Sequence, residues 1–303
     1  FAGFPTRIAL VAGRDAGPLY QNFPSLSQFS FAVVVATLPD GTEQWIDPTL
    51  TWAADDFLPW RASGAGALLL DKRRKNPLVE LPRLTDPGLT RFDVQVAPHA
   101  GGRAGLTVEI TLFGESAVEM RERLAPAGGA EREDQVREWL GTVGPPMPFE
   151  GLTLEGLEEI ERPLKLRFTA EVSGMMLTAD EAVGMRGCIF ECYDGRAPLS
   201  AERIAPFFVD RGERHLQSVL LTPPSGRVAT AVPPLAEATS AIGTYAFGCE
   251  TKETGEVECL RALTLPRARL PATDAEAVRA MFRKASEMDR RGVTFAPAPG
   301  AAH

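Results

Sequence analysis

Residues 28–49 read QFSFAVVVATLPDGTEQWIDPT. Within this stretch, Phe31 to Thr37 is an apolar run rich in valine, which predicts a buried strand. Asp40-Gly41 is a tight-turn dipeptide, so Glu43 to Ile46 is expected to return as the second strand of an antiparallel hairpin. Upstream, Thr6 to Ala12 (TRIALVA) predicts another buried strand. The beginning of the chain is therefore expected to be β-sheet.

The sequence changes character after this hairpin. Residues 50–87 are irregular and contain four prolines, and only Ala65 to Leu70 suggests a short strand. We expect a connector here, so residues 1–87 form the first unit. In residues 88–145, the segments 90–98 and 104–114 alternate apolar and polar positions around a glycine-rich turn, which predicts a second hairpin.

Two capping-box spacings predict where helices begin, because a Ser or Thr side chain can accept a hydrogen bond from the backbone N–H three residues later. The pair at 116–119 predicts a short helix over 116–124, followed by a second helix over 130–140. The pair at 273–276 predicts a C-terminal helix over about 273–291. Its apolar face favours docking onto the protein's own sheet over binding a membrane or partner.

Residues 146–270 predict a β-sandwich-like domain, because short strands recur at regular spacing. The expected strands are 164–173, 187–193, 217–221, 227–231, 244–249 and 257–265. Residues 271–303 are expected to hold the C-terminal helix and a disordered tail after Phe295. The predicted fold class is α+β, mainly β.

Composition excludes several functions. The chain has 303 residues, 44% hydrophobic and 24% charged, with a formal net charge of −8. Scattered Lys and Arg in an acidic chain argue against a nucleic-acid groove, which needs a concentrated basic surface. No apolar run reaches the roughly 18 residues of a membrane-spanning helix. Because the chain begins with Phe1 and has no signal sequence, we expect a mature product or a piece of a longer chain.

All four cysteines lie in the C-terminal half. Cys249 and Cys259 flank a predicted hairpin, so a disulfide between them is plausible. Cys188 and Cys192 are expected not to bridge each other, because four residues of extended strand separate their Cα atoms too far. The alternative is that all four are buried free thiols.

Sequence motifs supply no catalytic group or metal site. His99, His215 and His303 are the only histidines, and none has a cysteine, serine or carboxylate motif beside it. No phosphate loop, nucleophile elbow or metal-ligand pair is present. We therefore expect no metal and no cofactor.

The quoted stretch resembles the segment of transglutaminase-like proteins in which a histidine opens one strand and a Trp-x-Asp-Pro-Thr motif closes the next. Looser matches at 64–70, 106–121 and 207–233 follow the order of bacterial secreted members with a C-terminal β-rich domain. In that family an upstream cysteine is the nucleophile, the histidine its base and the aspartate the group that orients the imidazole. The resemblance implies the end of a transglutaminase-like antiparallel sheet.

The resemblance places Asp47 on the aspartate position and Phe31 on the histidine position. A phenyl ring accepts no proton, and all four cysteines lie downstream, so the triad is expected to be vestigial. The chain is also expected to start after the nucleophile's helix. Asp47 then favours a structural role, as a carboxylate that hydrogen-bonds the backbone of its own turn.

We therefore predict a catalytically inactive, transglutaminase-like structural or binding subunit of an exported, periplasmic or cell-surface assembly. A protein partner, for example the N-terminal fragment of the same precursor, is expected to cover the truncated edge of the N-terminal sheet.

The alternative is an active cysteine peptidase or acyltransferase whose nucleophile is on a separate fragment and whose base is, for instance, His99. That alternative requires His99 to lie beside Asp47. A carbohydrate-binding sandwich is disfavoured, because the aromatic residues are only 8% of the chain and are not clustered.

Overall fold

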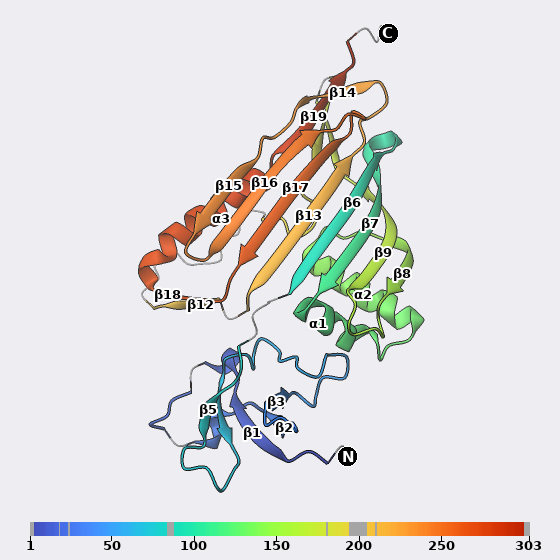
Figure 1. Ribbon diagram of the computed structural model, residues 1–303. Coiled ribbons are helices and arrows are strands. Elements are labelled where there is room, and N and C mark those ends of the chain that lie inside the picture. Colours follow the sequence, from blue (N-terminus) through green and yellow to red (C-terminus); the bar gives the residue numbers. More distant parts are fainter. Residues whose placement is uncertain are drawn as a thin grey trace.

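A computed structural model describes residues 3–17, 19–23, 25–83, 88–179, 181–193, 205–209 and 211–299. Two β-rich parts follow each other, a small N-terminal sheet and a much larger sheet that carries the helices (Figure 1). The predicted α+β, mainly β class is confirmed.

The N-terminal sheet is antiparallel, with strand order β3-β2-β1-β4-β5. Its strands are β1 (Thr6–Ala12), β2 (Phe31–Thr37), β3 (Glu43–Ile46), β4 (Gly66–Leu69) and β5 (Leu78–Glu80). The first three have the bounds expected from sequence. The expected connector instead adds β4 and β5 to the sheet, so β1 lies in its middle, paired on both sides. The short 3-10 helices η1 (Arg14–Ala16) and η2 (Leu26–Gln28) lie between β1 and β2.

The hairpin turn between β2 and β3 forms as expected. Gly41 has a φ of +86°, a value that glycine adopts without steric cost. Asp40 Oδ1 accepts a hydrogen bond from the backbone N–H of Thr42 at 2.9 Å, which closes the turn. This turn fixes the register of β2 against β3.

The larger sheet has eight strands in the order β15-β16-β17-β13-β6-β7-β9-β8. They are β6 (Leu89–Pro98), β7 (Arg103–Phe113), β8 (Phe149–Glu155), β9 (Leu164–Ser173), β13 (Glu213–Leu221), β15 (Ala236–Ser240), β16 (Gly243–Thr251) and β17 (Val257–Leu265). Neighbours are antiparallel except β6 and β13, which run parallel.

The division at residues 145 and 146 does not separate two sheets. Strands β6 and β7 of the expected 88–145 unit pair with β13 and β9 of the expected 146–270 domain. The pairing of β6 with β13 joins strands more than 100 residues apart, and such a contact has no local sequence signal. The predicted strand at 187–193 is also wrong, since that segment is irregular.

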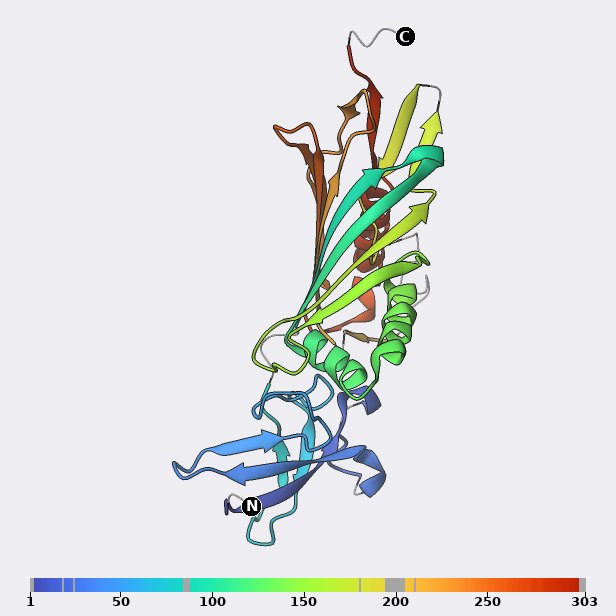
Figure 2. The ribbon, with the colours of Figure 1, turned by 90° about the vertical axis from the view of Figure 1, so that its right-hand side faces the viewer.

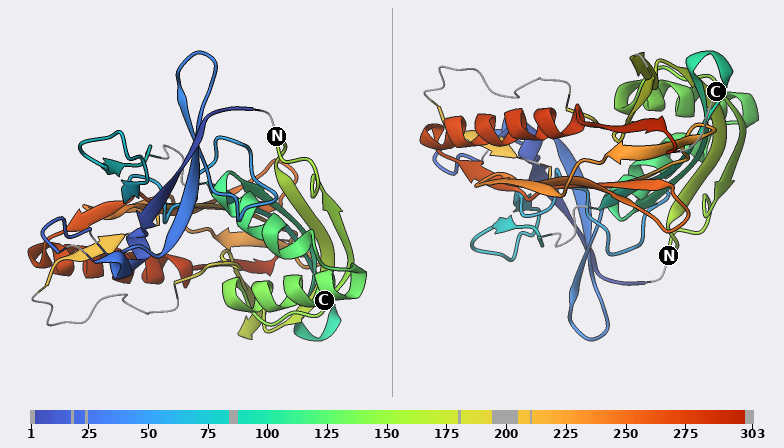
Figure 3. Two further views of the ribbon diagram at one scale, coloured as in Figure 1. Left: turned by 90° about the horizontal axis from the view of Figure 1, so that it is seen from below. Right: turned by 90° about the horizontal axis from the view of Figure 1, so that it is seen from above.

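Helices and a smaller sheet cover one face of the larger sheet (Figures 2 and 3). The helices are α1 (Glu115–Leu124), α2 (Gly129–Val143) and α3 (Ala275–Asp289). The smaller sheet has the order β10-β11-β19-β14, with β10 (Met176–Ala179), β11 (Ala182–Arg186), β14 (Arg227–Ala231) and β19 (Gly292–Pro297). Short pieces complete the fold: β12 (Phe207–Val209), β18 (Ala268–Leu270), η3 (Ala100–Gly102) and η4 (Ala272–Asp274).

Helix α3 docks onto β15 and β16 as predicted, burying Val278, Phe282 and Ala285. Neither expected capping box forms. Gly114, with no side chain, caps α1, and the N-cap of α3 is Asp274, whose side chain makes no capping bond. The expected disordered tail is also corrected, because β19 pairs with β11 and β14 and continues past Phe295.

In the part of the chain that the structure describes, no helix combines the length and hydrophobicity needed to cross a bilayer.

The structure contains two disulfides. Cys249 and Cys259 lie directly opposite each other on β16 and β17 and are bonded, with Cα atoms 4.0 Å apart. Cys188 and Cys192 are also bonded, with Cα atoms 6.0 Å apart, which contradicts the expectation that they could not bridge. The reason is that residues 187–193 turn instead of extending, and Glu191 has a φ of +54°.

Carboxylates of α1 join the two parts of the molecule. Glu122 accepts hydrogen bonds from the backbone N–H groups of Thr51 and Trp52, both at 2.6 Å. Glu115 accepts one from Trp60 N–H and is 1% exposed. Burial raises the pKa of Glu115, while the hydrogen bond from Trp60 N–H and, less strongly, the charges of Arg211 and Arg267 lower it. Its Oε2 is buried with no hydrogen-bond partner among the described residues.

This raised pKa predicts a pH-dependent stability. The folded state holds the Glu115 proton more tightly than the unfolded state does. The contribution of Glu115 to the free energy of unfolding is therefore most favourable at a pH where this side chain is protonated in both states. It falls as the pH rises from the ordinary value near 4.5 through the raised pKa. We expect Glu115→Gln, which keeps the Trp60 acceptor, to be more stable than wild type at pH 8 and to lose that advantage near pH 4. Urea unfolding at both pH values measures this, and an equal effect at both would contradict it.

Candidate functional site

Asp47 is held by its own turn. It follows β3 and is 4% exposed. Its Oδ1 accepts hydrogen bonds from the backbone N–H of Thr49 at 3.0 Å and from the Thr49 hydroxyl at 2.6 Å. Its Oδ2 lies 3.4 Å from Nη2 of Arg61. The carboxylate thus has backbone, hydroxyl and guanidinium partners.

Phe31 lies on the other side of Arg61. The Arg61 guanidinium carbon is 4.7 Å from the centre of the Phe31 ring, a cation–π distance. The β2–β3 register pairs Val34 with Ile46, and continuing it places Phe31 and Asp47 on the same face of the sheet. The Arg61 guanidinium therefore lies between Phe31 and Asp47, the residues at the histidine and aspartate positions of the transglutaminase-like resemblance.

This Phe31–Arg61–Asp47 cluster contains no proton acceptor suited to general-base catalysis. Arginine stays protonated in proteins, the phenyl ring has no basic atom, and the carboxylate is engaged by Thr49 and Arg61. The cluster fixes the end of β3 against the turn that follows it. Sequence reasoning missed Arg61, because it lies in an irregular segment whose path depends on tertiary contacts.

His99 lies far from Asp47 in the structure. His99 follows the last residue of β6, at the end of the β6–β7 hairpin remote from α1. Asp47 lies near α1, since Glu122 binds the N–H groups of Thr51 and Trp52. The ten residues of β6 separate the two ends by roughly 33 Å. His99 is therefore too far from Asp47 to act as its base, and the alternative of a cysteine peptidase or acyltransferase with another base stays a prediction.

His215 lies on β13 of the larger sheet, with Nδ1 3.4 Å from the Glu191 carboxylate. His303 falls outside the described residues. Among the described residues there is no group of His, Cys, Asp or Glu that could hold a metal ion.

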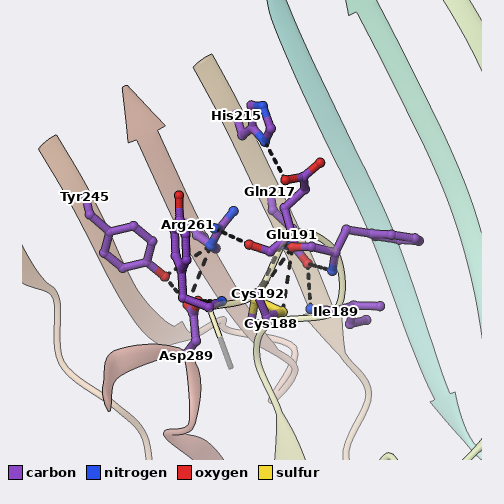
Figure 4. Close-up of a disulfide and its surroundings, with 11 residues drawn as sticks. Cys188, Ile189, Glu191, Cys192, His215, Gln217, Tyr245, Arg261 and Asp289 are labelled. Atoms are coloured by element: carbon purple, nitrogen blue, oxygen red, sulfur yellow. Dashed lines mark hydrogen bonds and ion pairs between the residues drawn. A yellow bond between two sulfur atoms is a disulfide. The ribbon is translucent and has the colours of Figure 1, made fainter. Parts of the chain in front are cut away.

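A second polar cluster, around the Cys188–Cys192 disulfide, is a structural element (Figure 4). The Gln217 side chain accepts hydrogen bonds from the backbone of Ile189 and Phe190 and donates one to Phe190 O at 2.9 Å. These bonds tie the disulfide loop to β13.

A buried arginine completes this cluster. Arg261, 2% exposed, donates from Nε to the Tyr245 hydroxyl at 3.1 Å and lies 3.5 Å from Asp289. Asp289 also accepts from Tyr245 and from the backbone N–H of Tyr193. Burial is the main cause of the raised pKa values of Tyr193 and Tyr245, so both remain neutral at physiological pH. The cluster joins α3 to the sheet.

The N-terminal sheet is apolar on both faces, and one face is open. Ala9, Val11, Val33, Val35 and Leu69 form the covered face and are fully buried. On the opposite face the register aligns two rows across the strands. One row is Ile46, Val34, Ile8 and Leu70, and the other is Ala32, Leu10, Leu68 and Leu78. We call these eight residues the open face.

The open face is exposed at one end and grooved at the other. Ile8 and Leu70 are each 50% exposed and lie beside each other, since Leu70 N–H bonds Ile8 O at 2.8 Å. At the other end a cavity of about 340 Å³ lies between Leu68, Leu78 and residues of the segments 19–23 and 25–29, where Phe23 and Leu26 are exposed to solvent. Helices α1 to α3 all lie with the larger sheet (Figures 1 and 2).

Comparisons with known proteins identify no family. No protein-family model matches the chain, and no curated protein matches it. A solved structure from Parabacteroides distasonis, described as a "putative protease", aligns with a TM-score of 0.47 and 14% identity over 97% of this chain and 41% of that chain. The chain thus spans less than half of that protein. A likeness this distant identifies neither activity nor substrate, and the transglutaminase-like resemblance stays a prediction.

We expect Asp47→Ala to destabilise the N-terminal sheet by about 2 kcal/mol or more, because it leaves the Thr49 N–H and the Arg61 guanidinium without their buried acceptor. Asp47→Asn keeps one acceptor oxygen and should cost less. Asp40→Ala is the matched control, since Asp40 makes the same kind of turn at the surface. Thermal unfolding should rank the losses Asp47→Ala, Asp47→Asn, Asp40→Ala, and equal losses for the two alanine variants would refute a structural role for Asp47.

Proposed function

We propose that this protein is a non-catalytic binding subunit that holds a helical segment of a partner protein on the open face of its N-terminal sheet. The carrying observation is that β1, β2 and β4 are apolar on both faces, while one face is fully buried and the other is only partly covered, with Ile8 and Leu70 half-exposed. Strands with this pattern occur where layers cover both sides of a sheet.

The partner segment has a definable chemistry. The open face is aliphatic and has no charged side chain in its two rows, so a complementary surface must also be aliphatic. Its five strands span roughly 19 Å, and an amphipathic helix of about 18 residues is long enough to cross them. Helices on sheets are a standard way to bury such a face.

The binding surface is a face of the sheet, whereas the sequence suggested an edge. Strand β1 is paired on both sides, by β2 and β4, so it leaves no unpaired edge. The edge strands among the described residues are the short β3 and β5. Short edges offer few free backbone groups for pairing, which favours side-chain contacts on the face as the means of association.

The Phe31–Arg61–Asp47 cluster supports the non-catalytic part of the proposal, since an arginine occupies the space between the two positions. Two disulfides support export to the periplasm or cell surface, because disulfides persist in oxidising compartments. Transglutaminase-like descent is proposed on the sequence resemblance alone.

The binding proposal predicts that an amphipathic Leu/Ala/Lys/Glu peptide of about 18 residues binds the protein. Ile8→Glu and Leu70→Glu should each weaken binding at least tenfold, since burying such a side chain contributes about 1.5–3 kcal/mol. Leu260→Glu is the control, because Leu260 is also 50% exposed but lies on the larger sheet. Fluorescence anisotropy of labelled peptide measures the affinities.

Equal losses in all three variants, or no binding by wild type, would contradict the proposal. Light scattering on the same samples identifies a different occupant: a wild-type dimer that Ile8→Glu dissociates would mean that a second copy covers the open face.

The non-catalytic part predicts that the protein neither hydrolyses a glutamine-containing peptide nor attaches a fluorescent amine to it. The physical reason is that the cluster at Asp47 lacks a base. Mass spectrometry of the peptide after incubation measures both reactions. Product formation that persists in Asp47→Asn would place activity elsewhere on the chain, and product formation lost in that variant would restore a catalytic role for Asp47.

A further inference from the structure

Arginines converge on a cavity near the junction of the two parts of the molecule. The cavity, of about 650 Å³, is lined by Arg14, Arg83 and Arg269, with Asp15 also on its wall. The rest of the lining is mostly glycine and alanine, from the segments 12–17 and 64–66. Small residues leave the backbone and the guanidinium groups as the main chemical groups of the wall.

Two guanidinium groups meet above Gly64. Gly64 has a φ of +66° and no side chain, and a Cβ added there would lie 3.5 Å from Arg83 Nε and 3.6 Å from Arg14 Nη1. Both charges therefore flank one small space. Any larger residue at this position would fill that space and strain the backbone.

A further arginine comes from the other part of the molecule. The carbonyl oxygen of the buried Ser63 accepts hydrogen bonds from Arg14 Nη1 at 3.3 Å and from Arg267 Nη1 at 3.4 Å. Arg267 lies between β17 and β18, and Arg269 lies on β18. Residues far apart in sequence thus bring cationic groups to the Ser63–Gly64 turn.

The neighbouring carboxylates offset this charge only in part. Glu80 pairs with Arg83 at 2.7 Å, but both side chains are largely exposed, and exposed pairs contribute little and rearrange readily. Asp15 Oδ1 lies beside Gly13, as does the Ser30 hydroxyl. Arg267 also lies within electrostatic reach of Glu115. Arg14 makes no ion pair among the described residues.

We propose that this cavity binds an oxyanion, a phosphate or carboxylate group of a small molecule, between Arg14 and Arg83. Guanidinium groups present paired N–H donors that match the oxygens of either group. Bound there, the anion contacts the N-terminal part directly and lies beside Arg269 of the larger part. It therefore stabilises the junction. This site is separate from the open face and does not depend on it.

Titration calorimetry of the intact protein with inorganic phosphate and, separately, with citrate tests the site, at ionic strength held constant with chloride. We expect saturable binding of at least one anion, and the tighter of the two identifies the group. Arg14→Gln with Arg83→Gln should weaken binding at least tenfold. Arg14→Lys, which keeps the charge but loses the paired donors, should give an intermediate affinity.

Arg91→Gln with Arg137→Gln is the matched control. It changes the net charge equally, but its arginines pair with surface carboxylates away from this cavity. If both double variants weaken anion binding equally, the loss is due to net charge and the proposed site is wrong. The absence of saturable binding in wild type would also contradict it. If Arg14→Gln with Arg83→Gln fails to fold, Arg83→Gln alone serves, because the Arg83 side chain is 76% exposed.

Discussion

The N-terminal sheet is constrained by having aliphatic side chains on both faces of its central strands. One face is satisfied by the protein's own core, where Leu58, Ala62 and Leu81 cover it. The other presents Ile8 and Leu70 half-exposed beside each other. Apolar area left in water is a free-energy cost that a second layer removes. The proposed partner helix follows from that partly exposed face. The hydrogen bonds at the Asp47 turn and at α1 hold the sheet to the rest of the chain.

Arg61 changes the meaning of the resemblance to transglutaminase-like proteins. Its guanidinium contacts both Phe31 and Asp47, so the space between a base position and its orienting carboxylate is occupied by a permanent cation. A cation in that place stabilises the carboxylate and transfers no proton. At the nearby junction the carboxylates of Glu115 and Glu122 instead accept hydrogen bonds from the backbone of residues 51–60, which ties the N-terminal part to α1.

Local sequence patterns predicted the local elements well. The FAVVVAT strand, the Asp40-Gly41 turn and β3 are consecutive in sequence, and the hydrogen bonds of this hairpin form between near neighbours. The run TRIALVA also forms the expected strand, although its partners on β2 and β4 are more distant. The pairing of β6 with β13, the bend at Glu191 and the place of Arg61 depend on contacts between distant residues, so no pattern within a short window encodes them. The open face is a partial exception. Apolar residues on both faces of its strands can be read from the sequence. Which face is left partly exposed depends on where the helices pack, and no local pattern encodes that.

Binding of a helix to the open face can be observed residue by residue with methyl NMR. Spectra of protein labelled at isoleucine and leucine methyl groups would be recorded while an amphipathic helical peptide is added. We expect shift changes concentrated at Ile8, Leu10, Leu68 and Leu70, with Leu216 and Leu260 on the larger sheet unchanged. Changes centred on Leu216 and Leu260, or none at saturating peptide, would contradict it.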